Sequence, residues 1–444
     1  MLSLREEGIT SIGAYAFSNC FSITEISIPS TVNEIGEAAF ESCTSLESIT
    51  FPDGLTSLPD GVVFACASLQ SVTIPDSVTF IDARAFGACD SLKEITLPEG
   101  LTAIGMKAFT RSGLVSLDLP DAITVIPNEL CFNCTDLAAV HLPDNLQSIG
   151  NEAFRLCSSL TQVELPSGLK TIGMMAFNAC AMTEIILPEG LETIAGNAFA
   201  GTKIAQVTIP ASVTSLNNTA FFDTNLTEIT FLGDNLDMVY RDGAVTDRAG
   251  TTMLFCLPGL TDFTVPEGIT QIAKEAFGGS KKLTRAVLPA GLEEIGNSLF
   301  NYCTSLTSVD ILMPLKVLPE NTFYYCDSLS EVNLPDTLEE IGMVAFAYSG
   351  IRTLTLPSHL KTIASGAFMS CPNLETLVIP EETETLSTYA IFGCPNLVSV
   401  TVPASVTDIS DGCFMNCPNM TVHTPAGSAA AQYCAGQGIP FVTE

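Results

Sequence analysis

The stretch "FGACDSLKEITLPEGLTAIG", residues 86–105, contains the features that decide the fold of this chain. In "LKEITLP" polar residues flank Ile95 on both sides, which is the period of two expected of a β-strand with one buried face. Pro98 ends that strand, because its ring fixes φ and its nitrogen carries no hydrogen for a sheet. "LTAIG" then predicts a second short extended segment, with Leu101 and Ile104 facing inward.

This pattern recurs with a period of 22 or 23 residues along nearly the whole chain. The prolines that end the strands form two series: Pro29, Pro52, Pro75, Pro98, Pro120, Pro143, Pro166, Pro188 and Pro210, then Pro266, Pro289, Pro335, Pro357, Pro380 and Pro403. The unit is L-x-x-I-x-L-P-x-x-L-x-x-I-x-x-x-A-F-x-x-C, in about 17 copies, and its Ala-Phe pair is expected to fill the interior. Since such a unit cannot bury its own apolar side, successive units must stack. We predict a repeat solenoid: a leucine-rich-repeat right-handed superhelix with a continuous parallel β-sheet, 22–23-residue coils, and short helical or extended segments on the other face.

Two stretches carry a resemblance to a known family. "SLKEITLPEGLTAIGMKAF", residues 91–109, and "SLTSVDI…VLPENTFYYC", within residues 305–326, resemble the repeats of BspA-like leucine-rich proteins. The resemblance covers about residues 8–420. It implies a bacterial protein that is secreted or displayed on the cell surface, as most members are, and a role in adhesion to host matrix proteins, as for some of them.

One interruption divides the repeats, between Leu232 and Pro266. Two turn signals there, Asp242-Gly243 and Ala249-Gly250, lie between apolar runs and predict an inserted β-hairpin. A purely structural insertion is favoured, and a recognition loop that uses Tyr240 and Arg241 stays open as the alternative. The predicted organisation is a first solenoid half (1–232), the hairpin or irregular segment (233–265), a second half (266–420), and a cap of a short helix (428–435) and a strand (440–442) within 421–444.

Twelve of the sixteen cysteines occupy one position of the repeat: Cys20, Cys43, Cys66, Cys89, Cys134, Cys157, Cys180, Cys303, Cys326, Cys371, Cys394 and Cys417. Other copies have serine or threonine there, so we predict a small side chain that donates a hydrogen bond to a turn carbonyl. In-register neighbours would point their Cβ atoms the same way, too far apart for a disulfide, and free buried thiols are expected. The "CFNC" of Cys131 and Cys134 has the spacing of redox and zinc sites, but Cys131 falls in the phenylalanine position and is interpreted as a core substitution, as is Cys413 in "CFMNC".

Charge and composition exclude several classes of function. The chain has 49 acidic and 17 basic residues, a net charge of -32, which repels phosphate backbones and anionic lipid, so nucleic acid is not expected as a partner. No apolar run approaches about 18 residues, so no membrane insertion is predicted. "MLSLREEGIT" lacks the order of a signal peptide, and we expect a piece of a longer protein whose signal or anchor has been removed.

No catalytic or cofactor site is predicted, because the three histidines lie in different coils and none has metal ligands or a nucleophile at the right spacing. Acids that recur just after the proline, such as Asp53, Asp76 and Glu99, favour solubility, with weak binding of divalent cations as the alternative.

Tyrosines form the best candidate contact surface. Tyr302, Tyr325 and Tyr348 are one repeat apart, each directly before the cysteine or serine position, and Tyr324 is adjacent. Their rings are expected to stack on neighbouring coils, either only to stabilise each other or to bind a partner.

A second candidate lies on the sheet face, where serine and threonine otherwise dominate. Asp118, His141 and Glu164 occupy matching positions of three successive coils. The row could raise the pKa of the imidazole or weakly bind a cation, and a solvated polar patch is the favoured interpretation.

The sequence therefore predicts a non-enzymatic, extracellular or cell-surface protein, monomeric, that binds a protein such as a host matrix or surface protein, or a glycan. The alternative from another class is a targeting or binding module of a larger secreted enzyme.

Overall fold

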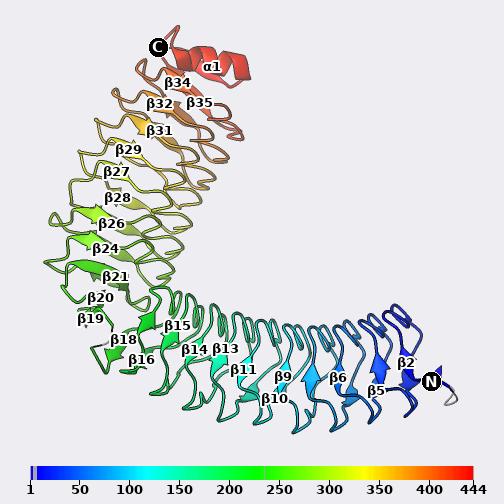
Figure 1. Ribbon diagram of the computed structural model, residues 1–444. Coiled ribbons are helices and arrows are strands. Elements are labelled where there is room, and N and C mark those ends of the chain that lie inside the picture. Colours follow the sequence, from blue (N-terminus) through cyan, green and yellow to red (C-terminus); the bar gives the residue numbers. More distant parts are fainter. Residues whose placement is uncertain (1, 4–7, 235, 444) are drawn as a thin grey trace. The chain divides into compact units, whose positions relative to one another are not determined.

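The computed structural model describes residues 2–3, 8–234 and 236–443, and it confirms the leucine-rich-repeat solenoid (Figure 1). The chain makes about 19 turns of roughly 23-residue coils, slightly more than the number of consensus copies because some coils lack the marker residues. It forms two compact units, residues 1–224 with 229–236, and residues 225–228 with 237–444.

In the first unit, two families of parallel strands run along the coils. The longer strands, at the position that precedes the proline in most coils, are β3 (Glu25–Ser27), β5 (Ser48–Thr50), β7 (Ser71–Thr73), β10 (Ser116–Asp118), β12 (Ala139–His141), β16 (Gln206–Ile209) and β18 (Glu228–Phe231), whose first residue belongs to the second unit. The two-residue β1 (Leu2–Ser3) pairs with β3 at the same position. The two-residue strands, which follow the prolines, are β2 (Ser11–Ile12), β4 (Glu34–Ile35), β6 (Ser57–Leu58), β8 (Phe80–Ile81), β9 (Ala103–Ile104), β11 (Val125–Ile126), β13 (Ser148–Ile149), β14 (Thr171–Ile172), β15 (Thr193–Ile194) and β17 (Ser215–Leu216).

The second unit repeats this arrangement. Its longer strands are β22 (Asp262–Thr264), β24 (Arg285–Leu288), β26 (Ser308–Ile311), β28 (Glu331–Asn333), β31 (Thr376–Val378), β33 (Ser399–Thr401), β35 (Thr421–Thr424) and β36 (Phe441–Thr443). The strands after the prolines are β23 (Gln271–Ile272), β25 (Glu294–Ile295), β27 (Val317–Leu318), β29 (Glu340–Ile341), β30 (Thr362–Ile363), β32 (Thr385–Leu386) and β34 (Asp408–Ile409).

A hairpin of β19 (Met238–Arg241) and β20 (Ala244–Asp247) begins the second unit. β20 pairs antiparallel with β21 (Thr252–Cys256), and β21 pairs parallel with β23. The hairpin is therefore joined to the second solenoid unit by a continuous sheet.

The longer strands do not form one uninterrupted sheet. The strand predicted before Pro98 is absent, although Leu92 and Leu97 are buried and Glu94 and Thr96 are exposed as expected. Strands are likewise absent at residues 162–165, 184–187 and 353–356. Each gap lies in, or directly before, a coil whose turn after the cysteine position is one residue shorter, although the coils of β10, β16 and β18 have the same shorter turn and keep their strands.

The remaining side of each coil is a series of turns in which alternate residues donate to the next coil. The N–H groups of Ala38, Phe40 and Ser42, for example, donate to the carbonyls of Asp60, Val62 and Phe64 at 2.7–2.9 Å. Of the predicted short helical or extended segments, the extended ones form, as the two-residue strands. No helix forms in the described coils.

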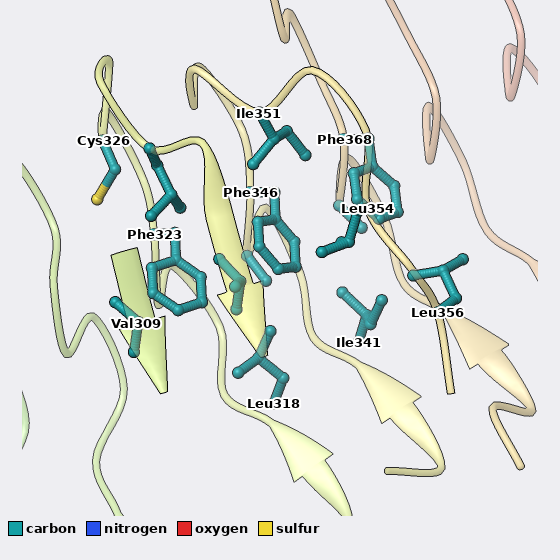
Figure 2. Packing of buried hydrophobic residues seen from close by; sticks show 14 of the residues in the cluster. Val309, Leu318, Phe323, Cys326, Ile341, Phe346, Ile351, Leu354, Leu356 and Phe368 are labelled. Atoms are coloured by element: carbon teal, nitrogen blue, oxygen red, sulfur yellow. The ribbon is translucent and has the colours of Figure 1, made fainter. Parts of the chain in front are cut away.

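Phenylalanines fill the interior, one ring above the next (Figure 2). Phe323, Phe346 and Phe368 are fully buried, and successive ring centroids lie 5.1 and 5.4 Å apart in stacked pairs. Leu318 and Ile341 of the short strands lie against them. The predicted role of the Ala-Phe pair is confirmed, and since every coil extends the same core, burial grows with each repeat.

The chain ends in α1 (Ala429–Gln437) followed by β36. Ser428 caps the helix by accepting a hydrogen bond from the N–H of Ala431, and Gly438 ends it in the left-handed conformation. The Tyr433 hydroxyl accepts a hydrogen bond from the N–H of Cys413 at 3.2 Å. The helix thereby covers the last coil. It also supplies an acceptor for the N–H of Cys413, which has no following coil whose carbonyl could accept its hydrogen bond.

Candidate functional site

The cysteine ladder is structural. All sixteen cysteines lie among the described residues and are free thiols, fourteen of them buried. The predicted hydrogen bond is confirmed: Cys326 Sγ, for example, donates to the carbonyl of Phe300 in the preceding coil at 3.1 Å, and Cys89 Sγ donates to that of Val63 at 3.3 Å. Burial raises the pKa of the Cys89 thiol to about 12, so this sulfur is a poor nucleophile at neutral pH.

Cys131 and Cys134 are packing residues too. Both are fully buried, and burial raises the pKa of the Cys131 thiol well above its usual range. Phe132, displaced by one position, lies half-exposed under Arg155, whose guanidinium carbon is 5.6 Å from the ring centroid. In the part of the chain that the structure describes, no group of three or more histidine, cysteine or acidic side chains is arranged to bind a metal ion.

The predicted tyrosine strip, Tyr302, Tyr324, Tyr325 and Tyr348, is one continuous cluster in the second unit. Tyr325 stacks on Tyr302 and on Tyr348, with ring centroids 5.3 and 4.5 Å apart and planes within 7° and 2° of parallel. Tyr324 meets all three edge-on, at centroid distances of 4.7–5.7 Å. Its half-burial against these phenols raises the pKa of the Tyr324 hydroxyl.

The strip presents hydroxyl groups that are unpaired within the chain. Tyr302 is 42% exposed and the other three are half-exposed. Among the described residues, none hydrogen bonds with any of the four hydroxyls. Four donors are therefore free for a partner, on rings whose stacking holds them in place.

The predicted row on the strand face of the first unit is also present. Asp118 and His141 are paired residues of β10 and β12, and Glu164 follows one coil later, all three exposed. No side chain among the described residues hydrogen bonds with any of them. The next residue in the row is Ile186, 22 positions after Glu164 and 85% exposed, which the sequence analysis missed. Extending the row by one more repeat would have found it.

The two candidate residues of the hairpin differ in exposure. Tyr240 is half-buried opposite Val245, whereas Arg241 is exposed beside Asp242 at the turn. Among the described residues, neither forms a hydrogen bond, ion pair or ring contact with another candidate residue, so the hairpin is a separate surface.

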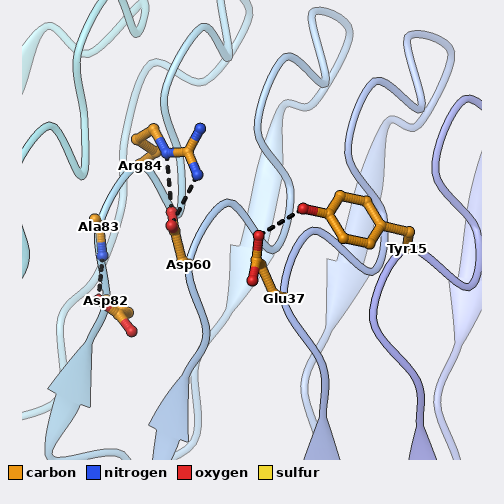
Figure 3. Close-up of polar contacts among 6 residues, drawn as sticks. All are labelled: Tyr15, Glu37, Asp60, Asp82, Ala83 and Arg84. Carbon is orange, nitrogen blue, oxygen red and sulfur yellow. Dashed lines mark hydrogen bonds and ion pairs between the residues drawn. The ribbon is translucent and has the colours of Figure 1, made fainter.

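Polar side chains also join consecutive coils at the turn edge (Figure 3). The Tyr15 hydroxyl donates to Glu37, and Arg84 binds Asp60 through two hydrogen bonds of 3.0 and 2.7 Å. The partly exposed Arg84–Asp60 ion pair contributes at most about 1 kcal/mol, and both contacts join neighbouring coils.

No helix in the described part of the chain has the length and apolar composition needed to cross a membrane.

Comparison with solved structures finds leucine-rich-repeat proteins of bacteria. A leucine-rich repeat protein from Bacteroides ovatus is 25% identical, over 98% of this chain and 88% of that one, with a TM-score of 0.40. A leucine rich cell surface protein from Faecalibacterium prausnitzii is 21% identical, over 97% and 89%, with a TM-score of 0.35. The pneumococcal vaccine antigen PcpA is 16% identical, over 98% and 92%, with a TM-score of 0.37.

A search of curated proteins found no match. The family described as BspA type leucine rich repeat region, in six copies, matches residues 10–138, 124–241, 252–371 and 298–421. These matches cover almost all of the coils and agree with the resemblance carried by the repeat motif. The chain belongs to the BspA-type leucine-rich repeat family.

Proposed function

We propose that this chain is a non-enzymatic, extracellular or cell-surface protein that adheres to a protein partner through the tyrosine strip. The observation that carries the proposal is the four-ring cluster itself: phenols on three successive coils, with hydroxyl groups that no described residue pairs. Tyrosine is enriched among the residues that dominate binding energy at protein interfaces, because it adds a large area at a small cost in side-chain entropy.

The ring geometry supports a protein rather than a glycan as the partner. Sugars bind aromatic side chains through the ring face, but both faces of Tyr325 are covered by Tyr302 and Tyr348. At the centre of the strip, ring edges and hydroxyls remain exposed, and these are suited to backbone and side-chain acceptors of a protein surface.

The extracellular or surface location rests on the family, most of whose members are secreted or displayed on cells. Free, buried thiols neither require nor exclude that location. The described side chains of the tyrosine strip include no nucleophile paired with a base, which supports a binding role for that surface rather than catalysis.

The test is capture of a partner from matrix or cell-surface extracts, followed by affinity measurement with the purified partner. The variant carries Tyr302→Ser, Tyr325→Ser and Tyr348→Ser, and we expect at least about a tenfold loss of affinity. Serine already occupies the same repeat position at Ser42 and Ser370, so the variant is expected to fold, which a melting curve checks.

The matched control is Tyr389→Ser, in the same unit but outside the strip, at a tyrosine that is 44% exposed. It should leave affinity unchanged. Equal affinity for wild type and the strip variant would refute the proposal and leave self-stacking as the whole role of the rings.

A further inference from the structure

The strand face of the first unit departs from its own pattern in four consecutive coils. One exposed position per coil forms a row, in which serine or threonine stands on either side of the departure: Ser27, Thr50, Thr73, Thr96, Thr208 and Thr230. Between them the row reads Asp118, His141, Glu164 and Ile186. A solenoid needs only a small polar residue here, so the change is not required for folding.

These four coils also line a hollow of about 870 Å³. Asp144 and Glu184 contribute two more carboxylates, and no lysine or arginine lines it. None of its four carboxylates forms an ion pair or a side-chain hydrogen bond within the described residues. The hollow is therefore an uncompensated negative surface within a chain whose net charge is already -32.

The second unit shows how the same face neutralises an acid when no partner is involved. Asp310 occupies the corresponding row there, and it binds Arg285 of the preceding coil at 2.8 Å and Asn333 of the following coil at 2.6 Å. These partners lower the pKa of the Asp310 carboxyl. Among the described residues, Asp118 and Glu164 form no such ion pair or side-chain hydrogen bond, although His141 lies between them in the row.

An apolar group completes the hollow. Ile186, at 85%, has the largest exposed fraction of any large hydrophobic residue that the structure describes. A branched aliphatic side chain held in water beside unpaired carboxylates is suited to a ligand that is cationic along most of its length and apolar at one end.

We propose that this hollow is a second binding site, which takes an extended basic segment of a protein partner ending in an apolar side chain. Stacked coils are about 4.8 Å apart, so Asp118 and Ile186 are about 14 Å apart along the row. An extended peptide advances about 3.3 Å per residue, so side chains at positions i and i+4 span about 13 Å. Basic residues at i and i+2 then lie over the carboxylates while an apolar residue at i+4 reaches Ile186.

The probe is a fluorescein-labelled peptide, Gly-Ser-Arg-Gly-Arg-Gly-Leu-Gly-Ser, whose binding is measured by fluorescence polarisation. We expect saturable binding that weakens as salt is raised, because exposed charge pairs are screened. The double variant Glu164→Gln with Glu184→Gln should lose about tenfold or more in affinity. Ile186→Thr, which restores the residue found at Thr208, should weaken binding of the leucine peptide but not of a peptide with serine in its place.

Two controls separate the site from the general field of the chain. Asp76→Asn with Glu99→Gln removes the same charge elsewhere in the unit and should leave binding unchanged. The tyrosine-strip variant should also bind the peptide normally, so the two sites can fail independently. Absence of binding at millimolar peptide, or equal losses in the hollow and control variants, overturns the proposal.

Discussion

At the scale of single residues, the turn edge of each coil demands an unusual backbone conformation. The residue before the cysteine position has a positive φ in every described coil that contains this position, yet it is glycine only at Gly201, Gly279 and Gly393. Hydrogen bonds to the next coil impose it, as when the N–H of Ala88 donates to the carbonyl of Thr110 at 2.7 Å. The left-handed conformation costs a non-glycine residue about 1 kcal/mol, which coil stacking offsets.

We therefore expect Ala88→Gly to raise the stability of the chain. Glycine removes the steric cost of φ 54° but adds freedom to the unfolded chain, for a net gain of about 0.5 kcal/mol. Ala85→Gly, at a buried residue three positions earlier with an ordinary φ, should instead lower it by about 1 kcal/mol. The midpoint of urea unfolding, measured for both variants, checks this prediction. Equal losses of stability in the two variants would contradict the role given to the left-handed position.

The residues of the two candidate surfaces differ in how well they can be predicted from the sequence. The tyrosines were found because one repeat separates them, and stacking in register brings such residues together. Ile186 was missed because an isoleucine in a strand is normally assigned to the core. Alignment with the repeat unit assigns the inward position to its neighbour Ile185, and the structure confirms this, because Ile185 is 8% exposed.

At the scale of elements, the cysteine ladder links stability to pH. Burial raises the pKa of the thiols of Cys89, Cys180 and Cys303 to about 12, against about 8.5 in an unfolded chain. Between these values the unfolded state loses protons that the folded state keeps. The stabilisation is fully present below about pH 8.5 and is lost as the pH rises toward 12.

The urea midpoint should accordingly fall from pH 8 to pH 10, measured with a reductant present. Each buried thiol can remove up to about 1.4 kcal/mol per pH unit in this window. A variant with Cys89→Ser, Cys180→Ser and Cys303→Ser should show a shallower decline, because serine keeps a donor at the position and does not ionise. Parallel curves for the two proteins would show that other groups cause the loss.

At the scale of the whole molecule, each unit is a one-dimensional stack in which a coil contacts only its neighbours. A stack of this kind has an open apolar end unless another element covers it. Cys413 and Phe414 of the last coil are buried, and Tyr433 of α1 contacts both, meeting the Phe414 ring edge-on. The cap thus protects only the coils next to it.

The variant Tyr433→Phe tests whether the cap protects only the coils next to it. Removing the hydroxyl leaves the N–H of Cys413 without its acceptor, a cost of about 1–3 kcal/mol. Hydrogen exchange should accelerate at Cys413 and in the adjoining coils, while exchange in the first unit stays unchanged. Tyr15→Phe is the control, because its hydroxyl bonds Glu37 at an exposed site. Uniform acceleration throughout the chain would show that the coils unfold together.

The sequence by itself determined the repeat, the residues that face inward, the small hydrogen-bonding position held by cysteine, and the alignment of Tyr302, Tyr325 and Tyr348. All of these follow from a period that is written in the chain and from the need of each unit to bury its apolar side against the next. Family membership rests on the same period.

Only the tertiary structure decided where the strands break, which turn residues are left-handed, and which carboxylates lack a partner. Those outcomes depend on hydrogen bonds and charges supplied by the neighbouring coil, some 22 residues away. No strand forms before Pro98 although Leu92 and Leu97 lie inward as the pattern predicts, and Arg285 neutralises Asp310 whereas Asp118 has no such partner among the described residues. A local pattern cannot contain that information, because the energy of each coil is set by contacts between coils.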